Sequence, residues 1–181
     1  MRRSCAMKKQ NLIIGILIVV IAIILIVIVS IHLNTSKNYL LIDNENVYFG
    51  MAASLLIETN GEPVEINKDI SDTPQDEYIY TKEAFGKNME IRYYLYDGQL
   101  VEGYFIFDNV SFDSALTITE NIISKQKNYY SSKIGYYLSP LETDNTAQFK
   151  VSNGVGDGAT GVSFDFEYIA GKLTISAICQ K

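Results

Sequence analysis

Histidine, cysteine and tryptophan are nearly absent from this sequence. Its 181 residues include one histidine, His32, two cysteines, Cys5 and Cys179, and no tryptophan. A nucleophilic serine or cysteine needs a neighbouring base, most often histidine, so no Ser-His or Cys-His pair can form in the chain beyond His32. Zinc requires histidine or paired cysteine, and the acidic residues do not follow a calcium-loop spacing. We therefore expect no metal site and no cofactor.

The scarcity of cysteine also limits the ways in which the chain can be stabilised. Only Cys179 follows the long apolar run near the N-terminus, so no disulfide can form within the rest of the chain. An exported domain without disulfides is typical of a bacterial cell envelope rather than of an animal secretory pathway. Its stability must come from a hydrophobic core.

Charge is missing from residues 12–31, in which only Gly15 and Ser30 are not plainly apolar. As a helix this run would extend about 30 Å, the thickness of a bilayer core. The residues before it include four cations and no acid: Arg2, Arg3, Lys8 and Lys9. The pattern predicts an uncleaved signal anchor, a single-pass transmembrane helix over 12–32, with residues 1–11 as a basic cytoplasmic tail and the C-terminal domain outside the cell membrane.

The chain beyond residue 32 is acidic. It holds all 21 Asp and Glu but only 11 of the 15 Lys and Arg. Such a surface repels nucleic acid, so we expect no nucleic-acid partner. Residues 33–43 are predicted to form a membrane-proximal linker and 44–181 one extracytoplasmic domain of ordinary size. The expected partners are the membrane, as that of an integral protein, and a protein or other component of the envelope. The sequence does not specify an oligomeric state.

The sequence pattern predicts two hairpins. Asp97-Gly98 is a strong two-residue turn signal within 89–107, and it would place Ile91 opposite Tyr104. In that register Glu102 lies on the core face unless a bulge turns it outward. A second turn at Ala170-Gly171 brings together four apolar pairs: Tyr168 with Leu173, Phe166 with Ile175, Phe164 with Ala177, and Val162 with Cys179.

Helical spacing of apolar residues appears twice after residue 43. One helix is predicted from Asn44 to Asn60, and a second follows the N-cap Ser111. The expected fold class is therefore α+β, with the N-terminal transmembrane helix followed by an antiparallel sheet that carries about two helices on one face. The alternative is a tandem αβ repeat with halves 44–110 and 111–181.

The candidate sites are few. Asp165 and Glu167 share one face of a strand, the arrangement from which a carboxylate-dependent hydrolase of an envelope glycan would have to be built. Tyrosine is abundant, and not all of its side chains can point inward, so a surplus is available for binding: Tyr94, Tyr96, Tyr129, Tyr130, Tyr136 and Tyr137. We expect a non-enzymatic binding or interaction module of the cell envelope, with the hydrolase as the alternative.

Overall fold

The structure is a computed structural model that describes residues 19–26, 37–70, 75–130, 137–138, 142–143, 148–156 and 161–180. The chain divides into two compact units, Met1–Lys37 and Asn38–Lys181.

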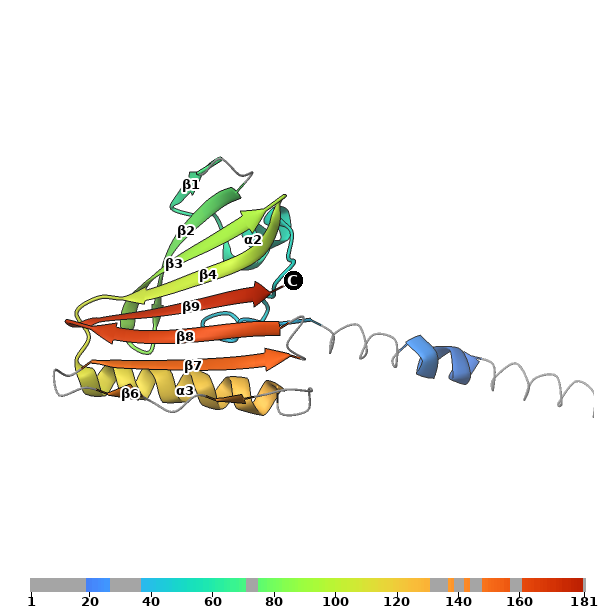
Figure 1. The fold of residues 1–181 in the computed structure, drawn as a ribbon. Helices are drawn as coiled ribbons and strands as arrows, with labels where there is room; N and C mark the ends of the chain where they lie inside the picture. Colours follow the sequence, from blue (N-terminus) through green and yellow to red (C-terminus); the bar gives the residue numbers. More distant parts are fainter. Residues whose placement is uncertain are drawn as a thin grey trace, which may run out of the picture. The chain divides into compact units, whose positions relative to one another are not determined.

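The predicted membrane span over 12–32 is wrong. Within it, the described residues 19–26 form a helix (Figure 1). In the part of the chain that the structure describes, no helix combines the length and the apolar character needed to cross a membrane. Residues 12–18 and 27–32 lie outside that part.

Several predictions depended on that span and are corrected with it. They are the signal anchor, the single-pass topology with a cytoplasmic tail over 1–11, the location of the domain outside the cell membrane, and the membrane as the partner of an integral protein. The transmembrane component of the predicted fold class is wrong for the same reason. The described chain is instead an antiparallel sheet accompanied by three helices, of which residues 19–26 are the first.

The described strands form one antiparallel sheet in which β1-β2-β3-β4-β9-β8-β7 are neighbours in this order, while β5 and β6 each pair with β7 (Figure 1). The strands are β1 (Glu65–Asn67), β2 (Gln75–Ala84), β3 (Lys87–Tyr96), β4 (Gln99–Phe107), β5 (Tyr137–Leu138), β6 (Glu142–Thr143), β7 (Phe149–Gly156), β8 (Gly161–Ile169) and β9 (Lys172–Gln180). The last strands of the two predicted halves, β4 and β9, therefore lie side by side.

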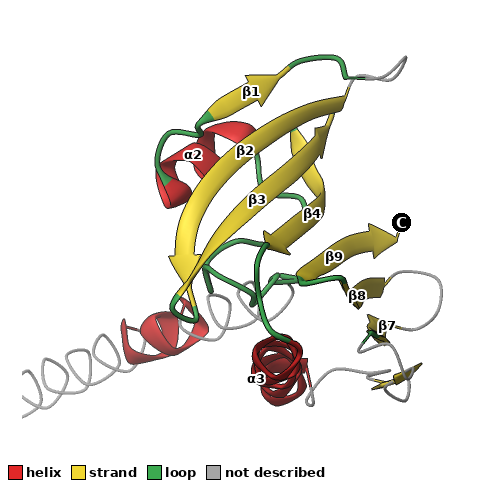
Figure 2. Ribbon diagram, turned by 90° about the vertical axis from the view of Figure 1, so that its left-hand side faces the viewer, coloured by secondary structure: helices red, strands yellow, loops and turns green. Residues whose placement is uncertain are grey.

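The helices of the second unit are α2 (Ala53–Asn60) and α3 (Phe112–Tyr130). The N-cap of α3 is as predicted, since the Ser114 amide donates to Ser111 Oγ at 3.2 Å. Helix α2 has eight residues and α3 has nineteen, so the helices of the two predicted αβ halves differ in length. Figure 2 shows α2 beside β1 and β2, and α3 at the other half of the sheet.

Helix α2 starts nine residues later than predicted because the preceding segment pairs with the sheet. Gly50 N donates to Leu100 O at 2.7 Å, and Leu100 N donates to Met51 O at 2.9 Å. Gly50 has a φ of 83°, which a helix does not allow. Tyr48 and Met51, whose spacing suggested a helix, are thus held by backbone bridges.

Three tight hairpins have a glycine as their second turn residue, and both turn residues take positive φ. They are Phe85-Gly86, Asp97-Gly98 and Ala170-Gly171. The four apolar pairs predicted for the last hairpin are confirmed. The middle turn is confirmed, but a bulge near Tyr94 shifts the register, so Ile91 faces Phe105 instead of Tyr104. The bulge turns Glu102 outward, opposite Tyr94.

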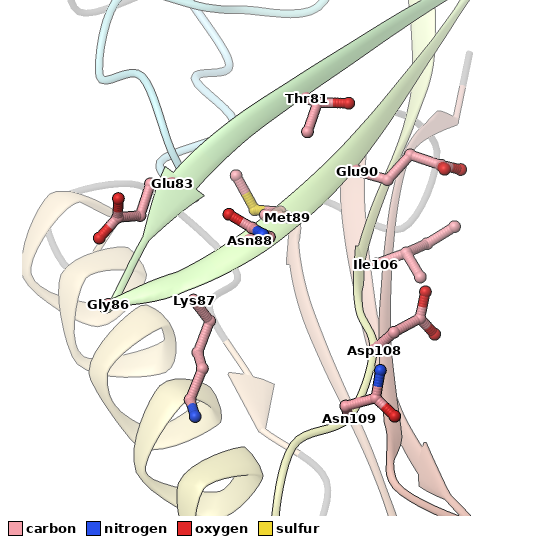
Figure 3. Close-up of a pocket in the computed structure, with 10 residues that line it drawn as sticks. All are labelled: Thr81, Glu83, Gly86, Lys87, Asn88, Met89, Glu90, Ile106, Asp108 and Asn109. Atoms are coloured by element: carbon pink, nitrogen blue, oxygen red, sulfur yellow. The ribbon is translucent and has the colours of Figure 1, made fainter.

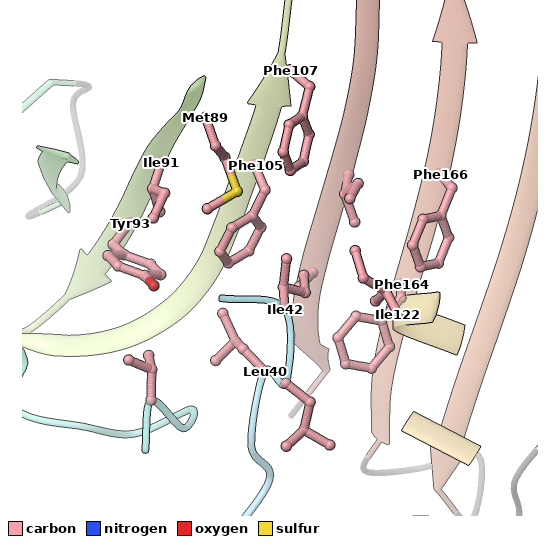
Figure 4. Close-up of a cluster of buried hydrophobic side chains, with 14 of the residues drawn as sticks. Leu40, Ile42, Met89, Ile91, Tyr93, Phe105, Phe107, Ile122, Phe164 and Phe166 are labelled. Carbon is pink, nitrogen blue, oxygen red and sulfur yellow. The ribbon is translucent and has the colours of Figure 1, made fainter. Parts of the chain in front are cut away.

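One face of the sheet, here called the inner face, is apolar from β2 to β7. Ile91, Phe105, Ile175, Phe166 and Val151 follow one another across it, and all are at most 3% exposed (Figure 4). Helices and loop pack onto this face through buried residues of α2, α3 and the segment that precedes α2, namely Leu56, Ala115, Ile118, Ile122, Leu40, Ile42, Val47 and Met51. Residues 40–42, placed in a linker by the sequence, are core residues.

Gly103 gives a test of this packing. It lies on the inner face, and a Cβ there would come within 3.0 Å of Leu40 Cδ2 and 3.2 Å of Phe105 Cε2. We expect Gly103→Val to lower the free energy of unfolding by about 1–3 kcal/mol through overpacking. Ser176→Val, on the opposite face of the neighbouring strand, is the matched control. Urea unfolding that shows equal losses for both variants would contradict this packing.

Candidate functional site

The opposite face of the sheet, here called the open face, is the candidate site. Both helices pack on the inner face, whereas the open-face side chains, with Glu77 as the buried exception, are half-buried or exposed. Strand register places them in three rows from β2 to β7. The first row is Glu77, Tyr94, Glu102, Ile178 and Ser163; the second is Ile79, Arg92, Tyr104, Ser176, Asp165 and Ser152; the third is Thr81, Glu90, Ile106, Thr174, Glu167 and Lys150.

Glu77 is the centre of a polar network on this face. Asn67 Nδ2 donates to its Oε2 at 2.9 Å, and the Tyr94 hydroxyl donates to its Oε1 at 2.8 Å. Arg92 approaches the same Oε1 at 3.5 Å and donates through Nε to Glu90 Oε1 at 2.6 Å. Glu77 is 7% exposed. A buried carboxylate is tolerated here because three donors surround it.

These contacts determine the pKa of Glu77. Burial alone raises it, but the hydrogen bonds from Asn67 and Tyr94 and the charge of Arg92 together hold the pKa below the ordinary value of 4.5. The same network acts on the phenol: burial, followed by its hydrogen bond to Glu77, raises the pKa of Tyr94 to about 12. Near neutral pH the pair is thus a carboxylate and a neutral phenol that donates to it.

A second tyrosine repeats this arrangement one strand away. The Tyr104 hydroxyl donates to Glu102 Oε1 at 2.8 Å, and burial together with this bond raises the pKa of Tyr104 to about 12. The rings of Tyr94 and Tyr104 meet edge to face, with centroids 5.6 Å apart and planes at 83°. Such pairs are favourable beyond the area they bury. The two rings are therefore fixed on the open face before any ligand arrives.

A groove of about 680 Å³ lies at this face where β2 and β4 end and β3 begins (Figure 3). Thr81, Glu90 and Ile106 of the third row line it, and so do Glu83 and Asp108. Its volume is in the range of small-molecule sites. In the described ranges no group of three or more His, Cys, Asp or Glu side chains is placed to hold a metal ion. The groove offers carboxylate and hydroxyl oxygens, the aliphatic side chain of Ile106, and the ammonium group of Lys87.

The six tyrosines proposed from the sequence do not share one surface. Tyr94 lies in the open face, and Tyr96 is exposed at the end of its hairpin. Tyr129 and Tyr130 belong to α3, where Tyr130 is buried and donates to Tyr39 O at 2.6 Å. Tyr136 lies outside the described residues, and Tyr137 is in β5. A binding role for these residues stays a prediction. Tyr94 belongs to the three rows of the open face, and Tyr96, two residues farther along β3, lies on the same side of that strand.

Sequence reasoning missed Arg92, Tyr104 and Glu77. The alternation from Met89 to Leu95 already places Arg92 and Tyr94 on one face, and it could have identified the first of them. Placing Tyr104 beside Arg92 requires the register of β3 with β4, and the bulge shifts that register. Glu77 lies in a strand whose pattern is hidden by acidic neighbours.

Asp165 and Glu167, the alternative catalytic pair, both belong to the open face. Ser152 donates a hydrogen bond to Asp165, while Glu167 lies between Thr174 and Lys150. Neither residue lines the groove at the other end of the face. Hydrolysis by this pair stays a prediction.

Glu77 gives a pH-dependent prediction. Since its pKa is lower in the folded state, the unfolded chain takes up its proton first as the pH falls. Its contribution to stability is complete above the unfolded pKa and is lost as the pH falls through the folded pKa. Glu77→Gln should therefore reduce the loss of unfolding free energy between about pH 7 and about pH 3.

The measurement is urea unfolding at both pH values. Glu167→Gln, an exposed change on the same face, is the matched control and should keep the pH dependence of the native chain. An unaltered pH dependence in Glu77→Gln would show that the network does not hold this carboxylate in its charged form.

Comparison with known proteins identifies no relative of this chain. No family model matches the chain, and no match was found among curated proteins or solved structures. The residues of the open face and its groove are thus the basis on which a function can be proposed.

Proposed function

We propose that this chain is a non-enzymatic binding module that takes a basic, extended protein segment on its open face. The observation that carries the proposal is the network in which Glu77, Tyr94 and Arg92 hold one another in place on the face opposite to the one that α2 and α3 cover. Ordered polar groups and rings on an accessible surface reduce the conformational entropy lost on binding. Tyrosine and arginine are also the residues most enriched among binding hot spots.

The charge of the open face selects the partner. Its three rows hold five carboxylates against the two cations Arg92 and Lys150, and Arg92 is already engaged by Glu77 and Glu90. The groove adds the carboxylates of Glu83 and Asp108 and one cation, Lys87, so carboxylates still outnumber cations. A surface of this sign attracts basic partners and speeds their association. The proposed ligand is therefore rich in Lys or Arg.

The size of the face sets the length of that ligand. Six strands, from β2 to β7, lie about 4.8 Å apart, so the second and third rows, which cross all six, each measure about 24 Å. An extended peptide covers about 3.4 Å per residue, which corresponds to about seven residues. The ring pair Tyr94–Tyr104 then offers apolar surface to the aliphatic stems of Lys and Arg, while nearby carboxylates take the charges.

An eight-residue lysine peptide is the probe for this proposal. We expect it to bind the native chain at low salt, with an affinity that falls as salt is added. Glu90→Gln together with Glu102→Gln should weaken binding about tenfold, because two charges leave the face while hydrogen-bond acceptors remain. Isothermal titration calorimetry measures both constants.

The matched control is Glu58→Gln together with Glu120→Gln, which removes two exposed charges from α2 and α3. It should change the affinity less than about twofold. Equal weakening in both double variants would reveal attraction by overall charge, and it would overturn the open face as the site. Absence of binding at low salt would overturn the proposal as well.

A further inference from the structure

The hairpin between β2 and β3 has a bulky residue in an unfavourable backbone conformation. Phe85, its first turn residue, has a φ of 55°. Asp97 and Ala170 hold the equivalent place in the other two tight hairpins. Asn, Asp and Gly suit this conformation, whereas a large side chain is rare there. An unfavourable residue at a turn indicates that its side chain is needed for something else.

The Phe85 ring forms a wall of a cavity. The ring is 39% exposed, and its inner side rests on Phe107 at a centroid distance of 6.3 Å. Beside it, between the hairpin and the N-terminal half of α3, lies a cavity of about 390 Å³. Its volume falls within the range of small-ligand sites. Ile118, which is 3% exposed, gives the cavity a second apolar surface.

Charges of opposite sign stand at the rim of this cavity. Lys87 enters it from β3 and extends toward α3, as Figure 3 shows, and Asp113 enters it from the first turn of α3. Within the described residues neither takes part in an ion pair of 4.0 Å or less. Asn121, two turns farther along the same side of α3, adds an amide. The cavity thus has an apolar floor, one cation and one anion.

We propose that this cavity binds a free α-amino acid with an apolar side chain. Lys87 Nζ takes the carboxylate, the Asp113 carboxylate takes the ammonium group, and the side chain of the ligand lies against Phe85 and Ile118. A ligand with only one charge would leave either Lys87 or Asp113 without a partner. A ligand without an apolar part would leave the surface of Phe85 and Ile118 in contact with water. Of the residues that line this cavity, Lys87 also lines the groove of the open face, but the proposal does not depend on the function proposed for that face.

The first test uses L-phenylalanine and three analogues that each lack one feature. N-acetyl-L-phenylalanine lacks the ammonium group, L-phenylalaninamide lacks the carboxylate, and glycine lacks the side chain. We expect L-phenylalanine to bind the full chain at millimolar concentration or below, and each analogue to bind at least about tenfold more weakly, because each leaves a contact unmade. Calorimetry or amide chemical shifts measure these affinities.

Phe85→Asn separates a binding role from a structural one. Asparagine suits the backbone of this turn, so the variant should unfold at an equal or higher urea concentration, yet bind L-phenylalanine at least about tenfold more weakly. The matched control is Ala170→Asn, the same change of turn chemistry in a hairpin that does not line the cavity. Its affinity should remain that of the native chain.

Lys87→Met gives a second variant that keeps an unbranched side chain and removes the charge. It should abolish the preference for L-phenylalanine over L-phenylalaninamide. The proposal is overturned if L-phenylalanine does not bind at millimolar concentration, if the analogues bind equally well, or if Phe85→Asn binds as tightly as the native chain.

Discussion

The structure depends on burying one face of a single sheet. Alternation along six strands places apolar side chains on the inner face, where Phe105, Phe164 and Phe166 are at most 1% exposed. Burial at about 25 cal/mol per Å² makes such a face the main source of stability in a chain whose described part has no disulfide. Because side chains alternate with a period of two, the same register that builds the core also aligns the open face.

That dependence explains how much of the fold the sequence could reveal. The hairpin at Ala170-Gly171 was predicted pair by pair, because turn position and alternation agree there. At Asp97-Gly98 the turn was right, but one extra residue in β4 shifted every pair beyond it. A bulge has no turn signal of its own, and only the polarity of Glu102 pointed to it.

The larger errors arose where tertiary contacts override a local pattern. Residues 44–52 show helical spacing, yet Gly50 and Met51 form backbone hydrogen bonds with Leu100, and Ala52 pairs with Gln99. Composition suggested a membrane span over 12–32, whereas the described helix there covers residues 19–26. The alternation along β3 could identify two residues of the site, Arg92 and Tyr94. The contact between Glu77 and Tyr94, however, depends on how β2 pairs with β3. Single-strand patterns do not contain that information.

The β2–β3 hairpin connects the two proposed sites physically. Lys87 lines both the groove at the open face and the cavity beside Phe85. One ammonium group cannot hold a carboxylate in the cavity and remain equally available to the groove. When it turns toward the cavity, the groove keeps Glu83, Glu90 and Asp108 with less compensation, and a basic segment is attracted more strongly. Because linkage is reciprocal, a basic segment bound in the groove would repel Lys87 toward the cavity and favour the amino acid there by the same factor. If both proposed ligands bind, Lys87, the first residue of β3, would couple two ligands of different chemistry.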